Sequence, residues 1–261
     1  MLTSLKQLTL EDGRSVTCTS PAEARMLWDD MSAEGYYRRA AAQLHPDDIV
    51  LDIGANIGLS AIAFADTCPG VRVIAVEPAP LAFECLRRNM GAHVPDGIAL
   101  ETGVGVANGT AQFTWYPRAS ANYSRYADRK RDNESTTTFL QNCGLDQNAI
   151  ALVTNDVHDG EQIDVKVTTV SALLADHAPT GEIGLVKIDV ERAELDVVRG
   201  IAESDWARIR TVVAEVHDCG DRLAQFCALL RSHGLATEVR QDAFLRGTEL
   251  YEVFACRPPT W

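Results

Sequence analysis

Five ionisable side chains stand at or near the ends of apolar runs, where they could bind a cationic ligand and move a proton. Asp52 and Glu77 belong to the first two runs, and Asp189, Glu215 and His217 belong to two later ones. Carboxylates attract cations and accept hydrogen bonds from hydroxyl groups, and a histidine titrates near neutrality and can act as a general base. These residue types therefore predict a ligand site with acid–base chemistry beside it.

The turn after the first apolar run is rich in glycine. Residues 50–58 read Val-Leu-Asp-Ile-Gly-Ala-Asn-Ile-Gly. Gly54 and Gly58 lack Cβ, so a ligand can approach the backbone closely there. A dinucleotide site requires the spacing G-x-G-x-x-G and no carboxylate beside the pyrophosphate. The wider glycine spacing and Asp52 favour instead an adenosine ligand that carries a positive charge and no phosphate.

S-adenosylmethionine is such a ligand, because its sulfonium and amino groups are positive and its ribose offers two hydroxyls to a carboxylate. Glu77, at the end of the second apolar run, is placed to accept hydrogen bonds from both hydroxyls. The predicted cofactor-binding residues are Asp52, Gly54, Ala55, Asn56, Gly58, Glu77, Pro78 and Tyr37.

The elements that must position these side chains alternate between apolar strands and helical patterns, which predicts a parallel sheet in an α/β fold. Strands are expected near residues 50–53, 71–76, 98–106, 184–190 and 210–216, and helices over 21–32, 59–65, 80–90, 170–175, 193–201 and 222–232. Residues 236–240 and 249–256 alternate apolar and polar positions and predict an antiparallel hairpin at the sheet edge. We expect a Rossmann-like, doubly wound sheet in a single domain over residues 1–261.

Two segments lie outside this alternation. Residues 1–45 are expected to form an N-terminal cap, and residues 117–162 an irregular insert on the substrate side. Asn108-Gly109 predicts a hairpin between the third strand and residues 111–116. Basic and aromatic side chains gather over residues 117–131, where they could grip an anionic acceptor or its carrier, or form a solvated lid.

Ligands of doubly wound sheets lie at the carboxyl ends of the strands. The strands that end near Asp189 and Glu215 are expected beside the first strand, which brings Asp189, Glu215 and His217 close to the reacting methyl group. Holding donor and acceptor together can supply about 7–11 kcal/mol of a displacement barrier. His217 is the candidate base. Alternatively, these carboxylates and the histidine could bind a divalent cation such as Mg2+ that acidifies an acceptor hydroxyl.

The composition restricts the classes of binding partner and the cellular compartment that we expect. A formal net charge of -13 argues against general affinity for nucleic acid or an anionic membrane, because phosphates would be repelled. Residues 1–12 contain no long apolar run, so neither a signal peptide nor a membrane span is expected. The 7 cysteines form no C-x-x-C pair and favour reduced thiols in the cytoplasm. The expected partner is a small-molecule acceptor, and a homo-oligomer remains open.

Three motifs resemble the FkbM-type methyltransferase family: residues 50–58, Val76-Glu77-Pro78, and residues 186–195, which read Val-Lys-Ile-Asp-Val-Glu-Arg-Ala-Glu-Leu. Ala214-Glu215-Val216-His217 and Glu34-Gly35-Tyr36-Tyr37 are also similar to it. The resemblance implies a seven-stranded class I methyltransferase fold, S-adenosylmethionine as methyl donor, and O-methylation of a hydroxyl on a sugar, glycolipid or polyketide. The chain departs from the family pattern at Arg192, where the pattern has glycine.

Three other functions remain open at this point. An N-methyltransferase would use the same residues on an amine. A catalytically silent adenosylmethionine-binding module would keep the glycine turn and lose the reaction. A nicotinamide oxidoreductase is disfavoured by the spacing of Gly54 and Gly58.

Overall fold

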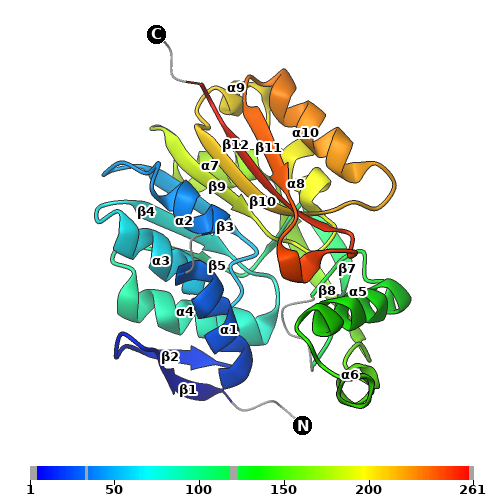
Figure 1. The fold of residues 1–261 in the computed structure, drawn as a ribbon. Helices are drawn as coiled ribbons and strands as arrows, with labels where there is room; N and C mark the ends of the chain where they lie inside the picture. Colours follow the sequence, from blue (N-terminus) through cyan, green and yellow to red (C-terminus); the bar gives the residue numbers. More distant parts are fainter. Residues whose placement is uncertain (1–4, 33–34, 118–122, 259–261) are drawn as a thin grey trace.

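The computed structural model describes residues 5–32, 35–117 and 123–258. A seven-stranded sheet lies at its centre (Figure 1). From edge to edge the sheet contains β11 (Ala236–Arg240), β12 (Leu250–Cys256), β10 (Thr211–His217), β9 (Ile183–Ile188), β3 (Ile49–Ile53), β4 (Arg72–Val76) and β5 (Ile98–Leu100). β12 is antiparallel to both of its neighbours, and the other neighbouring pairs are parallel. The predicted doubly wound α/β sheet with a C-terminal antiparallel edge hairpin is confirmed.

The strand order reverses between β3 and β9. The chain runs outward from β3 to β4 and β5, and it returns to the other side of β3 to build β9 and β10. Every residue of β3 and β9 is buried, which their continuous apolar sequences require of strands covered on both faces. A crevice at such a reversal is where doubly wound sheets bind ligands.

Helices cover both faces of the sheet. Phe64 and Leu86 pack on one face from α3 (Leu59–Thr67) and α4 (Pro80–His93). Leu174, Val197 and Phe226 pack on the other. They come from α7 (Val170–His177), α8 (Glu194–Arg199) and α10 (Arg222–Ser232), and α9 (Glu203–Trp206) precedes β10. Two separate hydrophobic cores thus pack on opposite faces of the sheet and fix where the carboxyl ends of its strands lie.

A second sheet corrects two of the predictions. The expected strand over residues 98–106 is divided between β5 and β6 (Gly103–Val104), which belong to different sheets. β7 (Gly109–Trp115) pairs antiparallel with β8 (Glu161–Thr168), so the hairpin expected at Asn108-Gly109 is wrong. The reason is side-chain burial: Phe113 of β7 packs with Val165 and Val167 of β8 in a third core. Alternation reveals a half-buried strand, but it does not identify the pairing partner.

The insert is also more regular than predicted. Its described part contains α5 (Arg129–Asn142) and α6 (Gln147–Thr154), each begun by an aspartate that accepts hydrogen bonds from two backbone N–H groups. The N-caps are Asp128 and Asp146. Most side chains of α5 are polar, so the helix carries no apolar stripe that periodicity could reveal. Arg118 of the predicted basic group lies outside the described residues.

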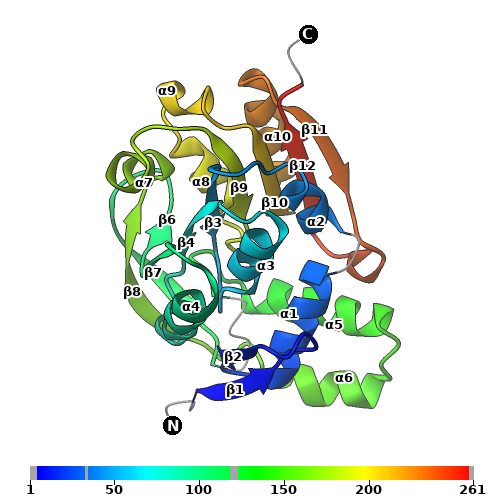
Figure 2. The ribbon, with the colours of Figure 1, turned by 90° about the vertical axis from the view of Figure 1, so that its left-hand side faces the viewer.

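The N-terminal segment packs against α3 and α4. It consists of β1 (Lys6–Thr9), β2 (Ser15–Cys18), α1 (Pro21–Ser32) and α2 (Tyr36–Ala41). Figures 1 and 2 show α1 and the α5–α6 pair at the same end of the molecule. A short 3-10 helix, Ala243–Leu245, lies between β11 and β12 and packs against α5. Among the described residues, no helix combines the length and the apolar character that a membrane crossing requires.

Candidate active site

A cavity of about 160 Å³ lies at the carboxyl ends of β3, β4, β9 and β10. Most of the residues predicted from the sequence line it, and they come from five different segments. Those that line the cavity are Tyr37, Gly54, Ala55, Asn56, Glu77, Pro78, Asp189 and Glu215. Asp52, Gly58 and His217 are not on its wall, and each of them instead supports a residue that is.

Glu77 is held rigidly at the mouth of the glycine turn. Its two carboxylate oxygens accept hydrogen bonds from the backbone N–H groups of Asn56 and Ala79, at 2.9 and 2.8 Å. Burial raises the pKa of Glu77 to about 7, although the two backbone hydrogen bonds oppose the shift. Each oxygen retains a second lone pair, so the carboxylate can still accept hydrogen bonds from a ligand's hydroxyl groups.

The end of β9 lies so close to residue 54 that only glycine fits there. Its φ is +77°, and a Cβ at this position would lie 1.7 Å from the carbonyl oxygen of Asp189. The backbone N–H groups of Gly54 and Ala55 both donate to the carbonyl oxygen of Val76. The close approach therefore locks the turn to β9 and β4, and it holds Asp189 beside the turn.

Asp52 lies behind the cavity wall. Its carboxylate is fully buried, accepts a hydrogen bond from Ser60 Oγ at 2.6 Å, and lies 3.3 Å from Lys187 Nζ. Lys187 also lies 3.3 Å from the carboxylate of Asp189 and donates to the carbonyl oxygen of Gly54 at 2.5 Å. Burial opposes the charge of Lys187, but its ion pairs with Asp189 and Asp52 raise its pKa. Lys187 thus ties the ends of β3 and β9 together.

Two tyrosines of α2 hold Glu215. Tyr36 and Tyr37 donate from their hydroxyl groups to Oε1 of Glu215, at 2.6 and 3.3 Å. Their rings pack on each other with centroids 4.2 Å apart. Both side chains are buried, so Glu215 is fixed between the N-terminal cap and β10. The prediction that Tyr37 belongs to the ligand site is consistent with its place on the cavity wall.

His217 is enclosed by two glutamates. Its Nδ1 lies 2.8 Å from Oε1 of Glu194, and its Nε2 lies 3.3 Å from Oε2 of Glu191. Burial alone would lower the pKa of His217, but the two carboxylates raise it well above its usual value. The raised pKa favours the cationic imidazole, which has no lone pair free to take a proton, so the assignment of His217 as base stays a prediction that the two carboxylates do not favour.

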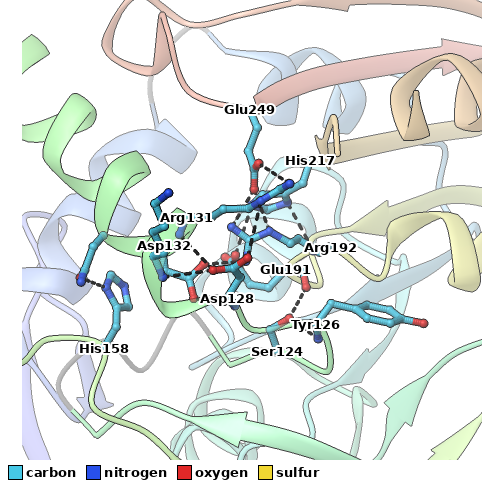
Figure 3. A network of polar contacts seen from close by, with 12 residues as sticks. Ser124, Tyr126, Asp128, Arg131, Asp132, His158, Glu191, Arg192, His217 and Glu249 are labelled. Carbon is cyan, nitrogen blue, oxygen red and sulfur yellow. Dashed lines mark hydrogen bonds and ion pairs between the residues drawn. The ribbon is translucent and has the colours of Figure 1, made fainter. Parts of the chain in front are cut away.

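Arg192 joins the site to the insert (Figure 3). Its guanidinium lies 2.5 Å from the carboxylate of Asp132 in α5 and 2.6 Å from that of Glu249, which precedes β12. Asp132 also accepts a hydrogen bond from Tyr116 Oη at 2.7 Å. The guanidinium of Arg192, the residue at which the chain departs from the family pattern, is therefore paired with two protein carboxylates. Sequence reasoning missed Asp132 and Glu249.

Two buried side-chain oxygens on the cavity wall have no hydrogen-bond partner within the described residues. They are the side-chain oxygens of Asn56 and Tyr123, and both residues line the cavity. Phe113 stacks on Tyr123 with ring centroids 5.4 Å apart. Buried polar atoms are normally paired, so these two oxygens indicate a place for a polar ligand.

The expectation of a divalent cation gains no support from the described part of the chain. There, no group of three or more histidine, cysteine, aspartate or glutamate side chains is arranged to hold a metal ion. The carboxylates of Asp189, Glu191 and Glu215 are engaged with Lys187, with His217 and with the two tyrosines, respectively.

Comparison with known sequences identifies the family. The family model described as "Methyltransferase FkbM domain" matches residues 52–238, which span the glycine turn, the insert and the strands that end at the cavity. The chain belongs to the FkbM methyltransferase family. It is therefore a methyltransferase, as the three motifs in its sequence predicted.

Several known proteins are similar to this chain in sequence. The chain is 35% identical over 254 residues to the 31-O-demethyl-FK506 methyltransferase FkbM of Streptomyces tacrolimicus, with 97% of each chain covered. It is 34% identical over 216 residues to Methyltransferase 1 of Beauveria bassiana, covering 81% of this chain and 82% of that protein. The AMB antimetabolite synthetase AmbE of Pseudomonas aeruginosa is 32% identical over 265 residues, and the match spans 12% of that protein.

Solved structures resemble this chain more distantly. The precorrin-6y C5,15-methyltransferase of Geobacter metallireducens aligns over 85% of this chain and 87% of its own, with 13% identity and a TM-score of 0.44. A 16S rRNA N2 G1207 methyltransferase of T. thermophilus, solved with AdoMet and guanosine, aligns over 98% of this chain and 50% of its own, with 12% identity and a TM-score of 0.45.

Proposed function

We propose that this FkbM-family methyltransferase uses S-adenosylmethionine to methylate a hydroxyl group of a small natural product, such as a polyketide, a sugar or a glycoside. The observation that carries the proposal is the pairing of a rigid, buried Glu77 with a glycine turn in a cavity whose other ionisable walls are mainly carboxylates. Such a cavity attracts a cationic adenosine ligand and repels phosphates.

The residues present fit the methyl donor. Glu77 would hold the ribose hydroxyls, and Asn56 Oδ1 and Tyr123 Oη, which lack partners in the described chain, would pair with polar groups of the ligand. Asp189 and Glu215 would attract its positive charges. Bound adenosylmethionine would supply the methyl group as an electrophile. The protein would contribute orientation and a water-poor setting.

The relatives support a hydroxyl acceptor. The name of the Streptomyces tacrolimicus relative specifies methylation at an oxygen of a demethylated FK506, and that protein matches nearly the whole of this chain. We accordingly propose oxygen rather than nitrogen as the methylated atom. All 7 cysteines are free thiols, which favours a reducing compartment and supports a cytoplasmic location for the reaction.

Calorimetric titration tests the ligand assignment. We expect S-adenosylmethionine and S-adenosylhomocysteine to bind with one site per chain, and NADH to produce no binding heat. Tight NADH binding without adenosylmethionine binding would favour a nicotinamide oxidoreductase instead.

An acceptor screen tests the reaction. The protein is incubated with S-adenosylmethionine and either 31-O-demethyl-FK506 or a panel of hydroxylated polyketides, glycosides and amines, and the methylated position is read by NMR. Methylation confined to amines would overturn the oxygen assignment. Adenosylmethionine binding without turnover on any acceptor would favour a catalytically silent module.

A further inference from the structure

We propose that Glu191 accepts the proton of the acceptor hydroxyl and that His217 and Glu194 are positioning residues behind it. This inference rests on the proposed function, because it names the group that completes the same reaction. Nothing in the family match distinguishes Glu191 from the other carboxylates of the site.

Three ionisable groups follow one another from the cavity into the protein. Glu191 lines the cavity and its side chain is 23% exposed. His217 comes next, with its side chain 10% exposed, and Glu194 is last at 1%. Only the first of the three can touch a substrate. His217 reaches the acceptor through Glu191, and Glu194 acts through His217.

The backbone that places Glu191 at the cavity adopts a strained conformation. Glu191 and Arg192 have φ values of 47° and 69°, a left-handed conformation that side chains with a Cβ rarely adopt. Such strain is of order 1–3 kcal/mol per residue and persists where the surroundings over-determine it. Ser124 Oγ donates to the carbonyl oxygen of Glu191 at 2.5 Å, and Arg192 N donates to Glu194 at 2.8 Å.

The side chain of Arg192 fixes the same turn from outside. Its ion pairs with Asp132 and Glu249 anchor the turn to α5 and to the approach of β12 (Figure 3). Glu191 is thus held toward the cavity by contacts from the insert, from β10 and from the C-terminal hairpin. A turn that served only to connect β9 with α8 would need none of these contacts.

Charge balance makes the arrangement competent for proton transfer. One imidazolium stands between two carboxylates, so the trio carries a net charge of about −1 before reaction. When Glu191 takes up a proton, His217 keeps Glu194 as its counter-ion, and no buried charge is left unpaired. Burial, which outweighs the pairing with His217, raises the pKa of Glu191 and makes it a stronger base.

Methyl transfer at this site forms one bond to carbon and breaks two other bonds. The acceptor oxygen forms a bond to the methyl carbon while the carbon–sulfur bond breaks and its electron pair returns to sulfur. The O–H bond of the acceptor breaks, and its proton passes to the carboxylate of Glu191. The products are the methyl ether, the neutral thioether and a protonated Glu191, which later releases the proton to solvent.

Asp189 is the competing carboxylate, and its surroundings assign it to the donor side. Its carbonyl packs against Gly54 of the glycine turn, and its carboxylate pairs with Lys187, which itself contacts Gly54 and Asp52. Glu191 contacts the insert through Ser124 instead. The two carboxylates thus face different partners, although they are separated by one residue in sequence.

Other charged groups surround the trio. Asp189 and Glu194 disfavour ionisation of Glu191, while His217 favours it. Glu249, which is paired with Arg192 and lies near His217, adds a further negative charge from the approach to β12. Because Arg192 is engaged by Asp132 and Glu249, it does not compete with His217 for Glu191.

The kinetic test compares Glu191→Gln with Asp189→Asn, using the acceptor identified in the screen. We expect Glu191→Gln to lower kcat by about 10²–10⁴-fold with little change in acceptor KM or in adenosylmethionine affinity. Asp189→Asn should mainly weaken adenosylmethionine binding. Wild-type kcat in Glu191→Gln, or the reverse division of effects between the two variants, would overturn the assignment.

A pH profile separates positioning by His217 from a merely structural role. In His217→Gln the cation beside Glu191 is lost, so the pKa of Glu191 rises and the acidic limb of the kcat profile moves to higher pH. A uniform loss of kcat at every pH, with the limb unmoved, would contradict the positioning role.

A measurement without turnover completes the test. NMR titration of the His217 imidazole should show it cationic through neutral pH in the wild type, with a lower pKa in Glu191→Gln because one of its two ion pairs is lost. An unchanged titration would show that the pair does not exist in solution and would overturn the inference alone. A wild type that neither binds adenosylmethionine nor methylates any acceptor would overturn the proposed function as well.

Discussion

At the scale of single residues, Glu77 has the clearest consequence for ligand binding. Its carboxylate is buried and has a pKa raised to about 7, and a cationic ligand binds the ionised form better than the neutral form. We expect the affinity for S-adenosylmethionine to fall by roughly tenfold as pH drops from 8 to 6, the difference between a charge-assisted and a neutral hydrogen bond. Calorimetry across this range measures it.

Glu77→Ala provides the matched comparison. It should bind S-adenosylmethionine more weakly at every pH and lose most of the pH dependence, since the titrating group is gone. The same linkage acts on stability. Because the pKa of Glu77 is raised in the native state, this state still holds a proton between pH 4.5 and 7, where the unfolded state has lost it. The contribution of Glu77 to stability therefore falls as pH rises from about 4.5 to 7. An identical pH dependence in wild type and variant would exclude Glu77 as its source.

Sequence reasoning found the cavity residues that carry a motif and missed those brought there by tertiary contacts. Glu77 and Asp189 follow apolar strands, so their place at the sheet edge was predictable. Glu191 lies inside the third motif, but the left-handed backbone that directs its side chain is not visible in the sequence. Asp132 lies in a polar helix of the insert, and only the fold brings it to Arg192.

At the scale of elements, the junction of β3 with β9 depends on Gly54. We expect Gly54→Ala to destabilise the protein by more than about 4 kcal/mol, because the new Cβ would overlap the Asp189 carbonyl. Gly13→Ala is the matched control, since its φ of +87° is also left-handed but no atom lies within 4 Å of the added Cβ. It should cost only about 1–2 kcal/mol. Equal losses in urea unfolding would show that backbone conformation, and not the strand contact, is what matters at Gly54.

The turn between β9 and α8 depends on Arg192. Arg192→Ala would leave the buried Asp132 and the half-buried Glu249 without their shared cation, which costs on the order of 3–5 kcal/mol. Arg192→Gly loses the same ion pairs but relieves the left-handed strain, so it should be about 1 kcal/mol more stable than Arg192→Ala. Thermal unfolding of both variants measures this difference.

Lys130→Ala is the control for this series. Lys130 lies in α5 near Asp132, but its ion pair with Glu134 is exposed and 3.8 Å long. Removing it should change stability by less than about 0.5 kcal/mol. If Lys130→Ala lost as much stability as Arg192→Ala, any change of charge in α5 would destabilise the protein, and the effect would not be specific to Arg192.

The elements of the main sheet were predictable because burial on both faces produces continuous apolar sequences such as those of β3 and β9. The partner of β7 was not, because pairing depends on which strand completes the core around Phe113. α5 was missed for the opposite reason: it buries little, so the signals of its start are the N-cap Asp128 and the polar residues that follow.

At the scale of the whole molecule, three regions distant in sequence converge on one cavity. The N-terminal cap contributes Tyr37, the second sheet contributes Phe113, and the insert contributes Tyr123. The parallel sheet supplies the carboxylates, and the surrounding segments enclose them. The proposed donor site is therefore built by the sheet together with the segments added to it.

The most direct test of the proposed methyl transfer is to supply S-adenosylmethionine with a deuterated methyl group and to identify the products by mass spectrometry. We predict that the wild type attaches the labelled methyl to a hydroxylated acceptor such as 31-O-demethyl-FK506, and that Glu77→Ala at the same low donor concentration forms far less product. The absence of labelled product from every hydroxylated acceptor, with a folded protein that does not bind the donor, would contradict the account.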